Sequence, residues 1–201
     1  MLFRSRKDDS NFKVTLNYLL KVIEPNRKAR QPSFFIERQQ TMYRINKNAK
    51  IVVDMHLFEK FIEESFATDD PSEALVHLLR ANKIFKGPPF EEYRHIDWIA
   101  PKREALENKF VRMHEKIAQH YAALGEYDKT ISWSEKLIDL DKTWEEAYRL
   151  LMISYFKLQN RPQSIKWYEK CKLALWEELN IEPMESTNRL YDMIINEKLL
   201  L

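Results

Sequence analysis

The strongest constraint on the fold of this chain is an internal repeat. Setting residues 121 onward against residues 155 onward, an offset of 34, brings like side chains together. The matched pairs are Tyr121 with Tyr155, Leu124 with Leu158, Ile131 with Ile165, Trp133 with Trp167 and Lys136 with Lys170. Two antiparallel helices of about four turns each, with their turns, occupy roughly 34 residues. Because one such pair cannot bury its apolar face alone, neighbouring pairs are expected to stack into a shallow superhelix.

A third copy precedes these two, and the residues that all three copies share indicate how the helices could pack closely. The second helix of each copy carries mostly small or apolar residues at the same +4, +3 spacing: Ala74, Leu78 and Ala81; Thr130, Ser134 and Leu137; and Ser164, Tyr168 and Cys171. Small side chains let a partner helix approach. The pattern resembles the tetratricopeptide repeat, although the small residue expected in the first helix is Ala118 in one copy and Met152 in the next.

Local signals place the ends of the helices. Asp70 is a predicted N-cap, with Pro71 at the first helical position and Glu73 reaching back to the cap; Asp54 is a second predicted cap. Residues 87–100, after the Gly-Pro-Pro break, are expected to form an irregular connection. The predicted helices cover residues 55–67, 71–85, 101–125, 127–140, 143–158, 162–178 and 186–199.

Composition excludes several classes of protein. The chain has only two glycines in 201 residues, which argues against phosphate-binding loops and dinucleotide-binding folds. The five histidines show no metal-ligand spacing, and Cys171, the only cysteine, falls at a packing position of the repeat. Nucleophile-elbow and zinc-protease motifs are absent. We therefore expect no enzyme, no cofactor and no metal. No apolar run approaches the length of a membrane span, which favours a soluble, cytoplasmic protein.

Charge is distributed unevenly along the chain. Residues 1–50 hold twelve Lys and Arg against four Asp and Glu, a net charge of +8, whereas residues 51–201 hold twenty-one against twenty-seven, a net charge of −6. A basic head on an acidic body suggests that the head meets a polyanion. An ordinary solvated basic surface is the alternative.

The basic head contains one amphipathic helix and one hairpin. The helix spans residues 10–25, between a predicted Ser10 cap and Pro25. Its apolar face comprises Phe12, Leu16, Leu19, Leu20 and Ile23. In the hairpin, within residues 33–45, Phe35 and Ile45 are expected to point inward and residues 38–41 to form the tip. Two strands alone are marginal in water, so the hairpin is expected to pack on the preceding helix.

A basic helix followed by a hairpin resembles the second half of a winged-helix DNA-binding domain, in which the helix enters the major groove and the hairpin is the wing. Within the whole chain, "EALVHLLRANKIFKG" and "EELNIEP" are similar to segments of the bacterial transcriptional activator domain family. This family includes the antibiotic regulatory proteins. The implied fold is mainly α: residues 1–50 form the C-terminal half of a winged helix, and residues 51–201 form a tetratricopeptide-like superhelix.

The resemblance also implies a function, that of a bacterial transcriptional regulator or its C-terminal part. Its expected partners are double-stranded DNA and a protein, either RNA polymerase or a second copy; no membrane is expected. The strands and helices that open the family's winged helix are missing here, and Gln40 and Thr41 replace the usual wing glycine. A DNA-independent interaction module of the same fold is the competing hypothesis.

The predicted DNA-binding residues fall into three groups. The outer face of the helix offers an amide for adenine, lysines for guanine or phosphate and an apolar group for the thymine methyl. The linker and the hairpin tip offer phosphate contacts. The full set is Lys13, Val14, Asn17, Tyr18 and Lys21 on the helix, Arg27, Lys28 and Arg30 in the linker, and Arg38 at the tip. A solvated amphipathic helix is the structural alternative. The tryptophans at 98, 133, 144, 167 and 176 are interpreted as packing between helices, and Glu145, Glu146, Glu177 and Glu178 as solvated.

Overall fold

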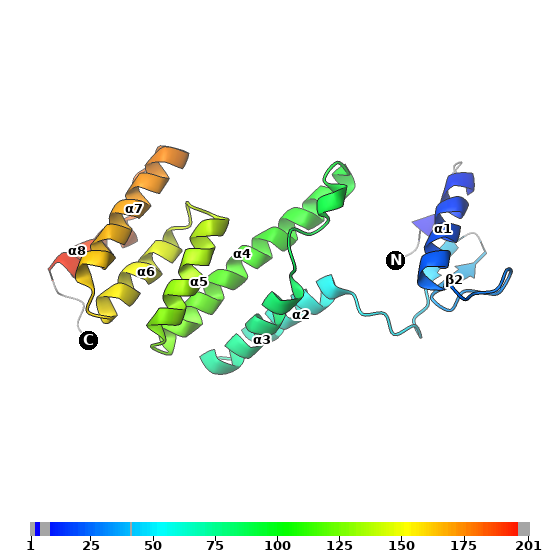
Figure 1. Ribbon diagram of the computed structural model, residues 1–201, viewed down its shortest axis with the longest axis horizontal. Coiled ribbons are helices and arrows are strands. Elements are labelled where there is room, and N and C mark those ends of the chain that lie inside the picture. The colour runs from blue at the N-terminus through cyan, green and yellow to red at the C-terminus, as the bar shows by residue number, and fades with distance from the viewer. Residues whose placement is uncertain (1–2, 5–8, 41, 197–201) are drawn as a thin grey trace. The chain divides into compact units, whose positions relative to one another are not determined.

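The computed structural model describes residues 3–4, 9–40 and 42–196 of the chain. It divides into two compact units, Met1–Val52 and Val53–Leu201. All regular secondary structure of the larger unit is helical within the described residues (Figure 1). Its α-helices are α2 (Asp54–Phe66), α3 (Pro71–Ile84), α4 (Ala100–Ala123), α5 (Tyr127–Leu140), α6 (Glu145–Lys157), α7 (Arg161–Leu179) and α8 (Glu185–Ile195). Two short 3₁₀ turns, η1 (Glu91–Tyr93) and η2 (Asp97–Ile99), lie in the connection before α4.

Successive helices pack as antiparallel pairs, α2 with α3, α4 with α5 and α6 with α7. Contacts of α3 with α4, α5 with α6 and α7 with α8 join each pair to the next. Helix α6 also contacts α4, the first helix of the preceding pair, and α8. This stacking confirms the predicted helical superhelix, and the helix bounds agree with the sequence prediction to within a few residues where the structure describes them.

The helix starts follow the predicted caps in one case and depart from them in another. Asp70 is the N-cap of α3 and its carboxylate accepts the N–H of Ser72 at 3.0 Å, with Pro71 first in the helix. Glu73 does not reach back to the cap; its carboxylate accepts the hydroxyl of Thr68. The prediction that Asp54 caps α2 is wrong, because the helix already begins at Asp54 and the cap position is Val53.

The small residues of the repeat lie where helices cross. Fully buried side chains include Ala74, Ala81, Thr130, Ser134, Ser164 and Cys171. The Ser164 hydroxyl in α7 donates to the main-chain oxygen of Met152 in α6 at 2.7 Å, which shows how closely the two helices approach. Burial raises the pKa of the Cys171 thiol to about 12. The complete burial of the Cys171 side chain confirms that it is a core residue.

Tyr168 departs from the small-residue pattern and contacts the last helix. It is half-buried; its hydroxyl donates to Asn188 Oδ1 in α8 at 2.7 Å, and its ring stacks on Tyr191 with centroids 4.0 Å apart. The tyrosine side chain is accommodated here by packing against α8.

A buried carboxylate holds α8 in place. Glu145, in the first turn of α6, is 8% exposed and accepts the N–H of Met184 at 3.0 Å and the hydroxyl of Thr187 at 2.6 Å. Arg149 lies 3.9 Å from the same carboxylate. The interpretation of Glu145 as a solvated residue is therefore wrong, because the start of α8 covers it and supplies its hydrogen bonds. A negative charge at a helix N-terminus is also favourable.

The core of the first pairs is rich in aromatic residues. The rings of Phe85 and Phe110 stack with centroids 3.8 Å apart. His114 lies beside them, 5% exposed, with its ring centroid 4.4 Å from that of Phe110 and 5.1 Å from that of Trp133. Its Nδ1 is 2.9 Å from the main-chain oxygen of Phe110. Burial lowers the pKa of His114 below 6.5; Lys136 adds to this effect and the Phe110 contact opposes it.

The buried histidine predicts that acid destabilises the fold. Below about pH 6.5 the unfolded chain binds a proton that the folded chain does not, so the free energy of unfolding should fall as the pH drops, by at most about 1.4 kcal/mol per pH unit. Urea unfolding at pH 7.5 and 5.5 measures the loss, and His114→Asn should reduce it. His56→Asn, an exposed control in α2, should not. An equal loss in the wild type and His114→Asn would contradict the prediction.

The smaller unit contains a helix and a three-stranded sheet. Helix α1 covers Asp9–Ile23, and the strands are β1 (Phe3–Arg4), β2 (Ile36–Gln39) and β3 (Met42–Ile45). The predicted hairpin is confirmed: β2 and β3 are antiparallel, with Ile36 opposite Ile45. Strand β1 was not predicted, and it pairs with the other edge of β3. Gln40, in the turn, has φ +53°, the left-handed conformation in which glycine is common.

The helix packs on the sheet through a few aromatic and aliphatic contacts. The rings of Phe12 and Tyr43 lie 5.1 Å apart, and Leu20 is buried. Phe35 is half-buried, but the expectation that Ile45 points inward is wrong, because its side chain is 62% exposed. Ile45 is the last residue of β3, two positions past the Tyr43 ring that contacts Phe12. The predicted Ser10 cap lies outside the side chains that the structure describes.

Candidate functional site

The outer face of α1 is a solvent-exposed stripe of mixed chemistry. All five residues predicted on it are exposed: Lys13, Val14, Asn17, Tyr18 and Lys21. The two with large apolar surfaces, Val14 and Tyr18, are 52% and 66% exposed. Lys21 Nζ lies 5.8 Å from the centre of the Tyr18 ring, so the cationic and aromatic groups are adjacent. Phe12, Leu16 and Leu20 lie on the opposite side of α1, which faces the rest of the unit. The amphipathic pattern of the sequence corresponds to this division.

The linker after α1 uses one of its three basic residues for structure. Arg27 donates to the main-chain oxygen of Gln31 at 2.5 Å and lies 3.7 Å from Glu24. Glu24 also accepts the N–H of Phe34 at 2.7 Å, and the pKa of its carboxyl is lowered, first by a hydrogen bond with Ser33. Arg27 is half-buried in this turn, whereas Lys28 and Arg30 are exposed.

The hairpin tip presents one exposed arginine. Arg38 Nε donates to the main-chain oxygen of Gln40 at 2.9 Å, and the guanidinium lies 5.9 Å from the centre of the Tyr43 ring. These contacts orient a side chain that remains exposed. By contrast, Arg44 on β3 forms an ion pair with Glu37 at 2.7 Å. Two further exposed lysines, Lys47 and Lys50, follow β3; the high positive charge of residues 1–50 was the only sequence signal for them.

This arrangement is suited to a polyanionic duplex. A helix that exposes lysines, an amide and an apolar group has the chemistry that reads base edges and phosphates in a major groove. Exposed basic groups in the linker and at the hairpin tip have the chemistry of backbone contacts. The structure brings the outer-face residues together on α1, and it shows Lys28, Arg30 and Arg38 exposed in the same unit.

The surface of the helical unit has exposed aromatic residues that the repeat pattern did not predict. Trp167 is buried, and Trp133 and Trp144 are half-buried, as expected for packing between helices. The packing interpretation is wrong for Trp98 and Trp176, which are 81% and 54% exposed. Trp98 lies in the irregular connection before α4, and Trp176 lies near the end of α7, where no following helix pair covers the outer face in the described residues.

Together these features define a helical-repeat protein that carries a small basic unit made of a helix and a hairpin. Among the described residues, no helix combines the length and the apolar character needed to cross a membrane. Residues 53–195 match the family model described as the bacterial transcriptional activator domain. The chain therefore belongs to the bacterial transcriptional activator domain family.

Named regulators are among the similar sequences. The chain is 28% identical over 126 residues to the "Transcriptional regulatory protein MoaR1" of Mycobacterium tuberculosis, a match that covers 63% of this chain and 40% of that protein. It is 24% identical over 131 residues to the "Transcriptional regulatory protein EmbR" of the same species, covering 63% and 32%. The matches thus span less than half the length of these relatives.

Two solved structures share the fold. Mycobacterium tuberculosis EmbR, in complex with a low-affinity phosphopeptide, superposes with a TM-score of 0.77 at 19% identity, over 99% of this chain and 52% of that one. The TPR2B domain of yeast Sti1, in its pHsp70 complex, gives a TM-score of 0.51 at 15% identity, over 71% and 98%. At these identities the likeness concerns the fold alone, and it agrees with the tetratricopeptide-like superhelix.

Proposed function

We propose that this chain is a bacterial transcriptional regulator, or part of one, that binds promoter DNA through its first unit and protein partners through its helical unit. In this proposal residues 1–50 are the C-terminal half of a winged helix and residues 51–201 are the activator domain. The supporting observation is the exposed stripe of Lys13, Asn17 and Lys21 on α1, beside a hairpin, in a chain whose family and relatives are transcriptional regulators.

The proposed mechanism is recruitment. Helix α1 would enter the major groove, where Asn17 is suited to adenine, Lys13 and Lys21 to guanine or phosphate, and Val14 and Tyr18 to apolar contact. Lys28, Arg30 and Arg38 would hold the backbone, joined by Arg27 to the extent that its linker contacts allow. Phosphate contacts would supply affinity, base contacts would set the register, and the helical unit would hold RNA polymerase or a second copy. Such a regulator would act in the cytoplasm, with no enzymatic step.

One observation favours the alternative of an interaction module that does not bind DNA. The apolar face of α1 is incompletely covered in the described residues, since Leu19 and Ile23 are 45% and 37% exposed. An apolar helix face of this kind suits docking on a protein. The two functions differ in their response to salt.

Counterion release provides the test of DNA binding. Lysines that bind phosphates displace counterions, so the logarithm of the affinity should fall linearly with the logarithm of the salt concentration. Changing Lys13, Lys21 and Lys28 together to Ala should reduce the slope by up to about 0.9 for each phosphate that is no longer neutralised. Fluorescence anisotropy with a duplex of mixed sequence, titrated at several salt concentrations, measures it.

The matched control changes three lysines of the helical unit, Lys60, Lys83 and Lys86, to Ala. All three are exposed, so this variant loses the same charge from the other unit. Its slope should equal that of the wild type. An affinity indifferent to salt, or equal slopes in the two triple variants, would contradict DNA binding by the first unit and favour the interaction module.

A further inference from the structure

The end of α7 and the turn that follows it form an apolar patch on the helical unit. Five large side chains within twelve residues are between 46% and 62% exposed: Leu173, Trp176, Leu179, Ile181 and Met184. Leu173 and Trp176 line a depression of about 370 Å³, with Glu169, Lys172 and Glu182 around it. Contiguous exposed apolar surface with a polar rim is typical of a protein interface. The charges around the patch indicate which partner fits.

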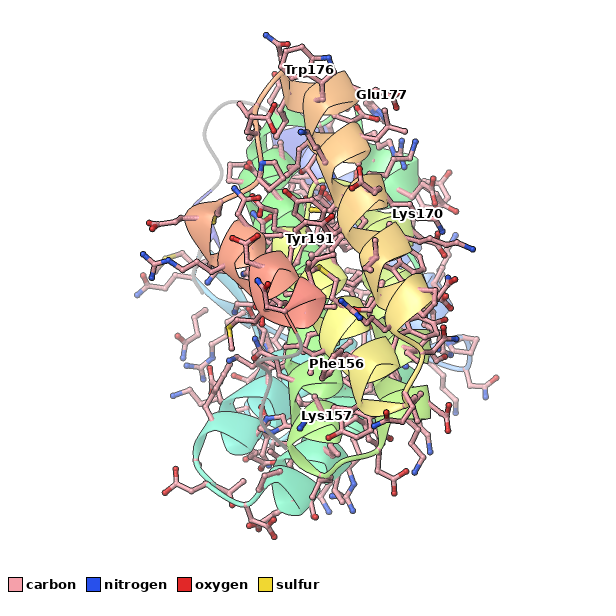
Figure 2. All side chains as sticks on the ribbon, turned by 90° about the vertical axis from the view of Figure 1, so that its left-hand side faces the viewer. Phe156, Lys157, Lys170, Trp176, Glu177 and Tyr191 are labelled. Atoms are coloured by element: carbon pink, nitrogen blue, oxygen red, sulfur yellow. The ribbon has the colours of Figure 1, made fainter. Side chains whose placement is uncertain are left out.

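Charge changes sign along α7. Residues 161–172 contain four basic residues and one acid, whereas residues 173–185 contain four glutamates and no lysine or arginine. The outer face follows the same order, because Lys166, Lys170, Leu173 and Glu177 recur at four, three and four residues and all are exposed. Figure 2 shows Trp176 and Glu177 near one end of α7 and Lys170 further along the helix.

The charged groups on this face have capacity for new ion pairs. In the part of the chain that the structure describes, Lys166 and Glu177 take part in no ion pair. Lys170 Nζ lies 3.8 Å from the centre of the Trp167 ring and is paired with no carboxylate there. A surface that is basic at one end, apolar in the middle and acidic at the other is complementary to itself when two copies meet in opposite directions. A parallel arrangement would place lysine on lysine and glutamate on glutamate.

We propose that the outer face of α7 is a homodimer interface in which the α7 helices of two copies pack antiparallel. The two-fold axis would pass close to Leu173, with Trp176 beside it, as an isologous interface requires. Lys170 and Glu177 lie seven residues apart, about 10.5 Å along the helix. Each Lys170 would therefore face Glu177 of the second copy, and both ion pairs would form at once.

This inference deepens the proposed function, because it names a second copy as the partner of the helical unit. Its test does not involve DNA, so the dimer and the DNA-binding role can fail separately. Sedimentation equilibrium of the full 201-residue chain, from about 1 to about 100 μM, covers the range in which a micromolar dimer dissociates. The wild type should form a dimer.

Charge exchange tests the antiparallel register. Lys170→Glu places like charges opposite each other twice, as does Glu177→Lys, so each variant alone should weaken the dimer on the order of tenfold or more. An equimolar mixture of the two variants should restore the dimer, because every opposed pair is then of opposite sign. The double variant should also dimerise. Circular dichroism establishes that each variant is folded, and Glu177→Lys keeps the test valid if Lys170→Glu is unstable.

A matched control is Glu135→Lys, which makes the same charge change at an exposed position of α5 and should leave the dimer intact. A monomeric wild type throughout the concentration range would overturn the proposal. So would a dimer that is unaffected by the single exchanges, or one that the mixture fails to restore, since either result would place the contact on another surface.

Discussion

Ser164→Leu is expected to destabilise the helical unit by about 2 to 4 kcal/mol. Ser164 has no exposed surface, and its hydroxyl donates to the main-chain oxygen of Met152 at 2.7 Å. A leucine side chain would not fit at this crossing without moving α7 away from α6. Overpacking a buried site costs about 1 to 3 kcal/mol, and removal of the buried hydrogen bond adds about 1 kcal/mol or more. Urea unfolding followed by circular dichroism measures the sum.

Ser164→Ala is the control for the hydrogen bond. It removes the hydroxyl without adding volume, so it should cost only about 1 kcal/mol. If leucine and alanine at this position were equally tolerated, α6 and α7 would not be in close contact here. The small-residue spacing would then not be the reason that the repeats stack.

Glu145→Ala is expected to release α8 from the end of the superhelix and to cost about 3 kcal/mol. The change leaves the N–H of Met184 and the hydroxyl of Thr187 without their acceptor and removes the carboxylate near Arg149. Removing one partner of a buried charged network typically costs about 3 to 5 kcal/mol, and partial access of water reduces this. Hydrogen exchange of the Glu145→Ala variant should show that the amides of residues 185–195 open faster than those of α4.

Two further variants isolate the role of the carboxylate. Glu145→Gln keeps the shape and one acceptor oxygen, so its cost should be roughly half that of alanine. Glu185→Ala removes an exposed carboxylate from α8 itself, one that pairs with Arg189 at the surface, and should have little effect. Equal protection of α8 in the wild type and Glu145→Ala would show that apolar packing alone holds this helix.

The helical architecture was predictable because its determinants are local and repeated. The 34-residue offset, the Asp70-Pro71 start of α3 and the buried series at Thr130, Ser134 and Leu137 all appear in the structure as the sequence indicated. These signals need only helical periodicity and short-range capping, which act between residues close in the chain.

The remaining features depend on partners distant in sequence. Two adjacent glutamates, Glu145 and Glu146, are typical of a solvated surface. Glu145 is buried because the start of α8 covers it, and its partner Met184 lies 39 residues later in the chain. Trp98 and Trp176 occupy helical or near-helical positions, but exposure is decided by whether another helix covers them. Strand β1 is only two residues long and forms only because β3 offers a free edge.

The candidate DNA-binding face was predictable only in part. Its exposure followed from the amphipathic period of α1, and the lysines, the amide and the aromatic group are all on the outside. The structural role of Arg27 did not follow, because its contacts with Glu24 and Gln31 arise from a turn that the sequence does not specify. Assigning this face to DNA remains a proposal, supported by family membership and by chemistry.

Amide NMR spectra recorded while a duplex is added to the isotopically labelled chain would locate the DNA contact residue by residue. If the basic unit binds DNA as proposed, the signals that move first and furthest will belong to α1, around Asn17, and to the hairpin around Arg38, while those of α4 to α8 stay in place. Signals that move only in the helical unit, or none at all at low salt, would contradict the assignment.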